Sequence, residues 1–216
     1  MTTTPPTLIA RSSSHFSRVA RIYVEELAVP CAFRPVYDIN ATDAGTFADN
    51  PLLRVPSLVT PQGTWFGSLN VCRALARLSA QHLRLVWPED LTEVIAANAQ
   101  EVVTDAMGTG VIIITARLTG TTDENPALRK PFARLAGALT WLETHLEAAL
   151  DAQPRGGDLS FLEVSAFCFL THLGFRGLGT LDAYPRLRAF TARFEARPSA
   201  QATPYRFDPP PVPHQG

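Results

Sequence analysis

Cysteine, lysine and long apolar runs are all scarce in this chain of 216 residues. Its three cysteines, Cys31, Cys72 and Cys168, lie far apart and lack the spacing of metal ligands, so no metal site is predicted. Lys130 is the only lysine, and a net charge of −1 gives no overall field that would attract nucleic acid or an anionic membrane. The longest apolar-leaning stretch, GVIIITARL, is far too short to span a bilayer.

The composition is that of an ordinary globular protein. Hydrophobic residues make up 46% and charged residues 18%, which argues against global disorder. The length allows one large domain or two small ones. The N-terminal MTTTPPTLIARSSS has no basic segment followed by an apolar run, and an odd number of scattered cysteines suits a reducing compartment. We therefore predict a cytoplasmic protein.

The first eighty residues alternate between strand and helix signals. Residues 7–10, TLIA, are predicted to form a short buried strand, and apolar residues at helical spacing from Phe16 to Leu27 predict a helix that Pro30 ends. CAFRPVYD follows as a second strand, parallel to the first. Two strands joined at PQG then form a hairpin, and a helix begins at about Ser68. The pattern is βαβ followed by ββα, typical of a small α/β sandwich.

Strand signals disappear after the break in HLRLVWPEDL, and helices are predicted over about 89–118, 127–151, 160–174 and 183–197. In DLSFLEVSAFCFL, Ser160 and Glu163 have the spacing of a capping box, so this serine is interpreted as a structural cap and its helix as the most buried of the second domain. The predicted domains are residues 1–80, a linker over 81–90, an all-helical domain over 91–206 and a Pro-rich tail over 207–216.

In this order of elements the sequence resembles the cytosolic glutathione transferases, over residues 7–205. Five segments carry the resemblance: SSSHFSRVARIYVEEL, NPLLRVPSLV, GSLNVCRAL, LSFLEVSAF and YPRLRAFTARFEARPSAQATPY. The serine-type first-domain motif is similar to those of bacterial, omega, zeta and tau members. The resemblance implies a thioredoxin-like first domain, a helical second domain, glutathione as co-substrate, a small electrophile as second substrate and a homodimer. Residues around Met107–Ile112 are then expected to form an apolar wall for the electrophile.

The resemblance also implies a glutathione-binding set. Val55–Pro56 is predicted to be a cis peptide bond, because that geometry lets the Val55 backbone pair with the cysteinyl part of glutathione. Ser68, at a helix N-terminus, would bind the γ-glutamyl carboxylate or act as a plain cap. Gly67 stands where the family usually has an acid for the ligand's ammonium group, so either another acid reaches that group or affinity is low. Arg54 is expected to face the glycyl carboxylate or to be solvated.

Three consecutive serines precede the first helix. Ser14 and Ser17 match the positions of the two thiols in related redox proteins, so dithiol–disulfide exchange is excluded. A hydroxyl there can instead donate to the glutathione sulfur and stabilise its thiolate, with the helix N-terminus adding positive potential. Ser14 is the first choice for this catalytic role, then Ser13 and then Ser12; the alternative is that Ser14 only caps the helix. His15, where the motif usually has proline, is interpreted as a solvated histidine.

Three functions are compatible with these residues. The first is a glutathione transferase that conjugates glutathione to an electrophile. The second is a binding module without catalysis, favoured by Gly67 and His15, since a fold alone does not establish an activity. The third retains glutathione but changes the reaction, to isomerisation, dehalogenation or peroxide reduction.

Overall fold

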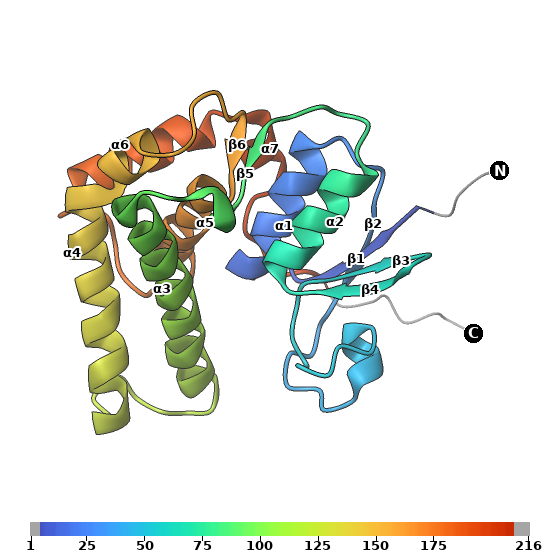
Figure 1. Cartoon of the computed structure of the whole chain (residues 1–216). Helices are drawn as coiled ribbons and strands as arrows, with labels where there is room; N and C mark the ends of the chain where they lie inside the picture. The colour runs from blue at the N-terminus through green and yellow to red at the C-terminus, as the bar shows by residue number, and fades with distance from the viewer. Residues whose placement is uncertain (1–4, 210–216) are drawn as a thin grey trace. The chain divides into compact units, whose positions relative to one another are not determined.

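The computed structural model describes residues 5–209 and divides the chain into two compact units. The first unit contains the described residues up to His82 together with those from Pro198 onward, and the second runs from Leu83 to Arg197. Figure 1 shows a mixed sheet with helices in the first unit and a bundle of helices in the second. The expected architecture, a thioredoxin-like domain followed by a helical domain, is confirmed.

The first unit is built on a four-stranded sheet of order β2-β1-β3-β4. Its strands are β1 (Thr7–Ala10), β2 (Ala32–Pro35), β3 (Ser57–Thr60) and β4 (Gly63–Phe66). β1 pairs in parallel with β2 and antiparallel with β3, and β3 pairs antiparallel with β4. The connection between the parallel strands β1 and β2 is made by α1, as the βαβ pattern predicts.

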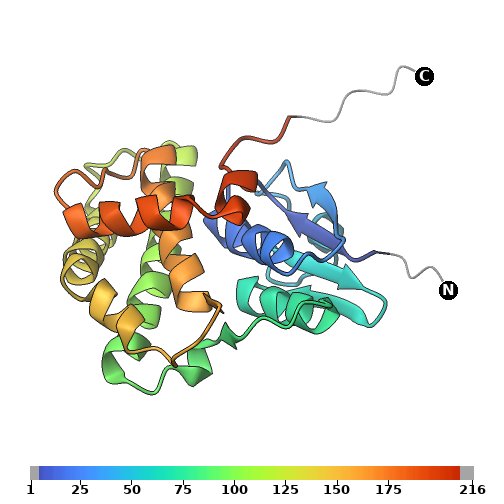
Figure 2. The same ribbon diagram turned by 90° about the horizontal axis from the view of Figure 1, so that it is seen from above.

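Helices α1 (His15–Glu26) and α2 (Ser68–Leu78) pack against each other on one face of this sheet (Figure 2). The opposite face is covered by the segment between β2 and β3, which contains the short helix η1 (Ala44–Phe47). Ile9, Val36 and Phe47 form a buried cluster there. Because successive residues of a strand face opposite sides, Ile9 belongs to this cluster while its neighbour Leu8 faces the helices.

The last described segment belongs to the first unit. The short helix α7 (Pro198–Ala202) packs against α1, and three hydrogen bonds join α1 to α7 and the segment that follows it. Arg18 donates to the Ala200 carbonyl at 3.2 Å, Arg21 donates to the Pro204 carbonyl at 3.2 Å, and Ser199 Oγ donates to the Glu26 carboxylate at 2.6 Å. The sequence assigned residues up to 206 to the helical domain; the structure instead places those after Arg197 with the sheet. Residues 210–216 of the predicted Pro-rich tail lie outside the described part of the chain.

The second unit consists mainly of four helices, α3 (Val94–Leu118), α4 (Arg129–Asp151), α5 (Phe161–Phe175) and α6 (Pro185–Glu195), with short helices η2 (Pro88–Asp90) and η3 (Pro126–Leu128). The helix predicted from residue 89 begins later, at Val94. Its expected first turn is the separate helix η2, which the Asp90 side chain closes by accepting the Trp87 N–H at 2.8 Å.

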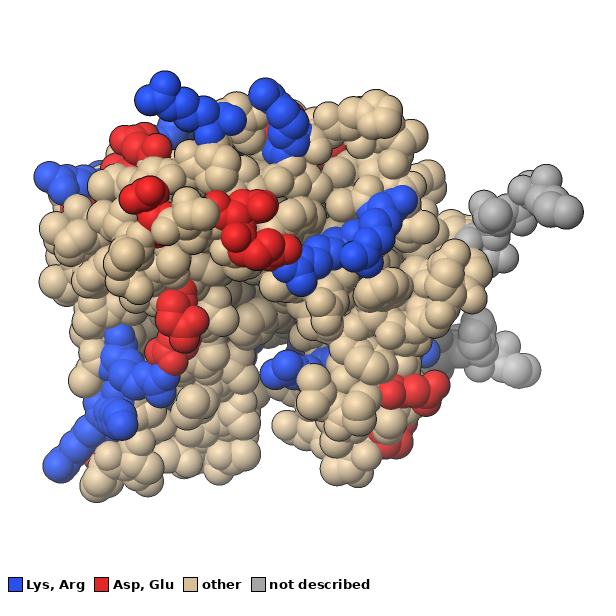
Figure 3. All heavy atoms as spheres, in the orientation of Figure 1, with Lys and Arg blue, Asp and Glu red and all other residues tan. Residues whose placement is uncertain are grey.

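Acidic and basic side chains both occur on the visible face (Figure 3), in keeping with a net charge of −1.

The expectation that no strand follows the first domain is wrong. Two-residue strands β5 (Leu85–Val86) and β6 (Leu159–Ser160) pair in parallel within the second unit. The Asp158 N–H donates to the Arg84 carbonyl and the Arg84 N–H donates to the Asp158 carboxylate, both at 2.8 Å. A strand of two residues is too short to show alternation, and its partner lies some seventy positions away, so the sequence carried no signal for this pair.

The prediction for α5 is confirmed. Ser160 is its N-cap and accepts the Glu163 N–H at 3.3 Å. Most of its side chains are buried on every side of the helix, including Phe167 and Cys168, each 0% exposed. An apolar sequence without a polar face can be accommodated only in the interior of a bundle, and α5 occupies that interior.

Candidate functional site

The serine turn, residues 11–14, connects β1 to α1 by local hydrogen bonds. The Arg11 carbonyl accepts the Ser14 N–H at 3.0 Å, and the Arg11 N–H donates to Ser17 Oγ at 3.2 Å. Ser17 is 0% exposed, so its hydroxyl is a structural tie between strand and helix. The two serines that match the thiol positions of redox proteins therefore differ. Ser17 is buried between strand and helix, and Ser14 lies at the N-terminus of α1.

Ser14 is the N-cap of α1. Its backbone is extended, with φ −100° and ψ 128°, and its Oγ accepts the Ser17 N–H at 3.3 Å. A hydroxyl that accepts one hydrogen bond can still donate its own proton. Ser14 is half-buried, and no acidic residue lies in the first turn of α1 to neutralise the positive end of the helix dipole. Ser14 can thus cap the helix and donate a hydrogen bond to a ligand at the same time.

The other two serines are less accessible. Ser13 is 5% exposed, and its Oγ accepts the Arg11 Nε–H at 2.9 Å. Ser12 is 1% exposed, and its N–H donates to the Asp208 carboxylate at 2.8 Å. These differences favour Ser14 as the hydroxyl that a ligand can reach.

The solvated histidine expected at position 15 is not observed, because His15 is 2% exposed. It is the first residue of α1, and its ring lies 4.6 Å from that of Phe16, centroid to centroid. The sequence indicated exposure because a lone histidine at a helix start has no apolar periodicity to bury it. Burial here is decided by tertiary packing.

The Val55–Pro56 peptide bond is cis, as predicted. β3 begins only at Ser57, so Val55 is outside the sheet, and none of the hydrogen bonds within residues 5–209 uses its backbone N–H or C=O. These two groups are what an extended peptide needs in order to pair as an added strand.

Asn50 holds the loop before this bond and is a residue to which the sequence analysis assigned no role. It is 0% exposed. Its Nδ2 donates to the Arg54 carbonyl at 2.8 Å and to Ser57 Oγ at 3.3 Å, while its Oδ1 accepts the Leu52 N–H at 3.0 Å. The only sequence signal was its place in NPLLRVPSLV, because a buried amide cannot be distinguished from an exposed one by spacing.

The mouth of α2 lies directly beside the cis bond. Gly67 is the N-cap, with φ 80° and no side chain to cap the helix, and its N–H donates to the Pro56 carbonyl at 3.0 Å. The plain-cap alternative for Ser68 is therefore wrong, since Ser68 is the first helical residue. The first turn of α2 has no acidic residue, so its N–H groups and dipole present positive potential.

A further hydrogen bond joins the two helix mouths: Ser68 Oγ donates to the Phe16 carbonyl at 2.9 Å. Together with the bond between Gly67 and Pro56, it brings the start of α1, the cis bond and the start of α2 to one end of the sheet. Two positive helix termini and an unpaired strand-like backbone suit a ligand with peptide character and a negative charge.

Arg54 lies on the same loop and is exposed. Its carbonyl is held by Asn50, whereas its guanidinium makes no hydrogen bond or ion pair with another residue in the part of the chain described. The guanidinium is therefore exposed and lies on the residue before Val55, and its proposed contact with the glycyl carboxylate stays a prediction.

Residues 5–209 contain neither a cluster of metal-ligating side chains nor a membrane-spanning helix. No group of three or more His, Cys, Asp or Glu side chains there is arranged to hold a metal ion. None of the described helices combines the length and hydropathy needed to cross a bilayer.

Comparison with known proteins agrees with this geometry. Residues 8–82 match the family model described as Glutathione S-transferase, N-terminal domain. The comparison with curated proteins found no relative of the chain.

Solved structures match nearly the whole chain. A glutathione transferase family member from Pseudomonas fluorescens with bound glutathione is 22% identical with a TM-score of 0.77, over 96% of this chain and 100% of the other. A glutathione S-transferase from Methylobacterium radiotolerans, in complex with glutathione sulfonate, is 20% identical with a TM-score of 0.73, over 97% and 99%. One from Methylobacillus flagellatus with bound glutathione is also 20% identical with a TM-score of 0.73, over 92% and 98%. The chain therefore has the glutathione transferase fold, and its residues 8–82 are similar to the N-terminal domain of that family.

Proposed function

We propose that this protein is a serine-type glutathione transferase that binds glutathione in its first unit and uses Ser14 to hold the glutathione sulfur as thiolate. The observation that carries the proposal is the state of Ser14: a half-buried N-cap whose Oγ accepts one hydrogen bond and retains a proton to donate. The bound glutathione of similar folds supports the choice of ligand.

The proposed binding mode follows from the three features at the end of the sheet. The Val55 backbone pairs with the cysteinyl unit, the α2 N-terminus at Ser68 receives the γ-glutamyl carboxylate, and Arg54 faces the glycyl carboxylate. In this arrangement the sulfur lies at the mouth of α1, next to Ser14. Ser13 is the second choice for the hydroxyl, but its bond from Arg11 and its burial favour Ser14.

The chemistry needs no ionised serine. The thiol loses its proton to solvent, and the Ser14 O–H donates to the sulfur, which stabilises the thiolate more than the thiol. Each unit by which the thiol pKa falls corresponds to about 1.4 kcal/mol of such differential stabilisation. The thiolate then attacks the electrophilic carbon of the second substrate, and a C–S bond forms as the leaving group departs.

One expectation about the helical unit, the apolar wall around Met107–Ile112, is revised by the burial of its residues. Met107, expected in an apolar wall, is 2% exposed, whereas Val111 and Ile112 on the same helix are 42% and 50% exposed. We place Val111 and Ile112 first for substrate selection. The homodimer and the cytoplasmic location stay predictions.

The test is a pH titration of the ultraviolet absorbance of the glutathione thiolate in the presence of protein. We expect the pKa of the bound thiol to lie below its ordinary value near 8.5 in wild type and to rise by about one to two units in Ser14→Ala. Ser13→Ala is the matched control and is expected to leave the pKa of the thiol unchanged. If the thiol pKa is the same in wild type and Ser14→Ala, Ser14 is not the activating group.

A second candidate function, a binding module without catalysis, is favoured by one observation. No acid stands at Gly67, and a charge-assisted bond to the ligand's ammonium group is worth about 1.5–3 kcal/mol. Calorimetry with glutathione separates the candidates, since saturation at millimolar glutathione supports the transferase and its absence the module. A substrate panel with product analysis then distinguishes conjugation from isomerisation, dehalogenation or peroxide reduction.

A further inference from the structure

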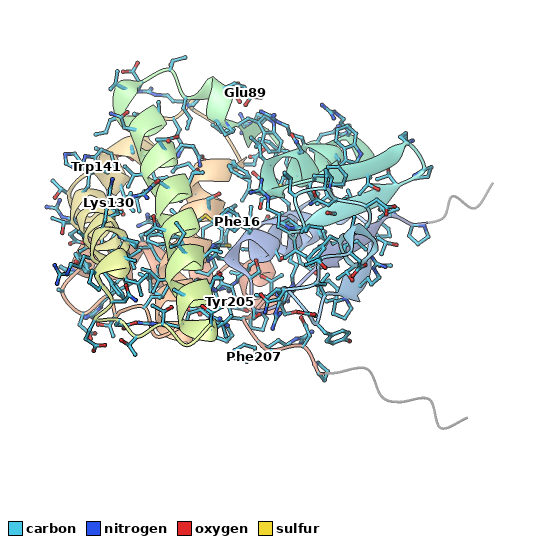
Figure 4. The ribbon with its side chains drawn as sticks, turned by 90° about the horizontal axis from the view of Figure 1, so that it is seen from below. Phe16, Glu89, Lys130, Trp141, Tyr205 and Phe207 are labelled. Carbon is cyan, nitrogen blue, oxygen red and sulfur yellow. The ribbon has the colours of Figure 1, made fainter. Side chains whose placement is uncertain are left out.

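A pocket of about 220 Å³ lies within the first unit. It is lined by β1, the serine turn, the second half of α1, the start of β2, and the end of α7 with the segment after it, on which Figure 4 labels Tyr205 and Phe207. Neither the cis bond nor the start of α2 contributes to its lining. Arg21 lies seven residues beyond Ser14 on α1, about 10 Å along the helix axis. The pocket therefore shares the serine turn with the proposed glutathione site, but Ser14 itself does not line it.

One wall of the pocket contains a buried polar atom without a partner. Ser12 is 1% exposed, its Oγ makes no hydrogen bond within the described chain, and the residue lines the pocket. Its backbone N–H is already engaged by Asp208 at 2.8 Å. A buried hydroxyl without a partner is unfavourable, and such groups in native proteins require an explanation. A ligand with an acceptor oxygen in the pocket provides one.

The charges around the pocket favour an anion. Arg21 and Arg206 line it together with one acid, Glu25, which gives the lining a net charge of +1, and a second acid, Asp208, lies beside the lining, where its carboxylate accepts the Ser12 N–H. Arg206 is exposed and makes no ion pair with another described residue. Arg21 is anchored by its bond to the Pro204 carbonyl at 3.2 Å, which fixes its charge at this place.

The remaining wall is apolar. Leu8, from the helix-facing side of β1, and Phe33, which is 40% exposed, line it together with Cys31. Burial raises the pKa of the Cys31 thiol, so this side chain is neutral and does not repel an anion. A cavity of about 150 Å³ is enough for benzene, so this larger pocket accommodates a ring together with a small polar group.

We propose that this pocket is a binding site for a small organic monocarboxylate with a flat apolar body. The apolar body packs against Leu8 and Phe33, the Ser12 hydroxyl donates to the carboxylate, and Arg21 and Arg206 supply the positive potential. Ser12 was the third choice for the hydroxyl that activates glutathione, but the proposal does not depend on glutathione binding, because Ser14, Val55 and Ser68 do not line this pocket.

The probe is benzoate, and the local reporter is the Cys31 thiol. Cys31 is partly exposed, whereas Cys72 and Cys168 are 0% exposed, so mild alkylation of the native protein reports on Cys31. We expect saturating benzoate to slow Cys31 alkylation at least fivefold. Benzyl alcohol lacks the charge and acetate lacks the ring. Each is expected to need about tenfold higher concentration than benzoate for the same slowing of Cys31 alkylation. Unchanged alkylation at millimolar benzoate overturns the proposal.

Calorimetric titration of variants assigns the contacts. Arg206→Gln is expected to weaken benzoate binding about tenfold, Arg206→Lys to restore most of it, and Ser12→Ala to weaken it about fivefold. Arg34→Gln, an exposed arginine of the same unit outside the pocket, is the matched control and is expected to bind like wild type. If Arg206→Gln and Ser12→Ala both bind benzoate with wild-type affinity, the ligand lies elsewhere and the assignment is overturned. Displacement of benzoate by glutathione would overturn it as well.

Discussion

Two helices of this protein begin in almost the same way, and only one beginning is suited to chemistry. Ser14 caps α1 and Ser160 caps α5, each accepting the N–H three residues on at 3.3 Å from an extended backbone. Around Ser160 the dipole meets Glu163 in the first turn, and the serine is 6% exposed. Around Ser14 there is no acid, and the side chain is half-buried.

The difference shows that a cap becomes a candidate site through its surroundings. At α5 the protein's own carboxylate meets the positive helix terminus, and the hydroxyl has only a structural role. At α1 the positive potential remains for a ligand, and the neighbouring mouth of α2 adds a second positive terminus without an acid. Local sequence alone describes both serines as caps.

The largest expected effect comes from removing each cap in turn. Ser14→Ala and Ser160→Ala are both expected to lower the free energy of unfolding by about 1 kcal/mol, because each loses a cap. Only Ser14→Ala should also lower kcat/KM at neutral pH, by roughly ten- to a hundredfold, in parallel with the raised pKa of the thiol. Urea unfolding and steady-state kinetics with an active electrophile measure both quantities. A comparable kinetic loss in Ser160→Ala would remove the distinction between the two caps.

A second variant supplies the acid that the mouth of α2 lacks. Gly67→Glu is expected to tighten glutathione binding about tenfold or more, by giving the ligand's ammonium group a carboxylate partner. Apart from the two chain neighbours, no heavy atom lies within 4 Å of a Cβ placed at this position, but φ of 80° is unfavourable for a residue other than glycine. A loss of about 1 kcal/mol or more of stability is therefore expected.

Gly67→Gln carries the same backbone cost without the charge and is the control for this prediction. Calorimetry and urea unfolding separate the two effects. Equal affinities for glutathione in the Glu and Gln variants would show that the ammonium group does not lie beside this position.

A smaller effect on the pKa of the bound thiol is expected from giving α1 an acid in its first turn, as α5 has. Phe16→Glu places an acid in the first turn of α1 and leaves the carbonyl that accepts Ser68 Oγ in place. A charge near a helix terminus contributes about 0.3–1 kcal/mol, so the pKa of bound glutathione's thiol should rise by roughly 0.2–0.7 units relative to Phe16→Gln. The thiolate titration measures it, and a lowered thiol pKa in Phe16→Glu would contradict the electrostatic account.

The smallest effect concerns the second unit alone. The pKa of Asp158 is lowered, first by the hydrogen bond from the Arg84 N–H and then by the Arg84 side chain. A carboxyl whose pKa is depressed on folding stabilises the protein above its unfolded pKa, about 3.9, and the contribution is lost as pH falls through the lower folded value. The difference in unfolding free energy between wild type and Asp158→Asn should therefore be present near neutral pH and disappear in acid.

Urea unfolding over a pH series measures that difference. Asp151→Asn, at the exposed end of α4, is the matched control for loss of one negative charge. A difference between wild type and Asp158→Asn that persists unchanged at low pH would show that the carboxylate charge is not what ties β6 to β5.

Most of the fold was predictable because its signals are local and periodic. The strand Thr7–Ala10 was found at its observed bounds, and the capping spacing of Ser160 and Glu163 gave the start of α5. The failures all involve long-range contacts. The β5–β6 pair, the burial of His15 and the packing of residues after Arg197 onto α1 join parts of the chain that no local pattern connects.

The same distinction between local patterns and long-range contacts applies to the candidate site. The sequence by itself determined which residues are present: a hydroxyl where a redox protein has a thiol, a Val–Pro pair before a strand and a glycine before Ser68. Only the tertiary structure decided that one of three serines is accessible, that Asn50 holds the loop, and that two helix mouths and the cis bond share one end of the sheet. The physical reason is that propensity and spacing act within a few residues, whereas burial and hydrogen-bond partners depend on which distant segments the folded chain brings together.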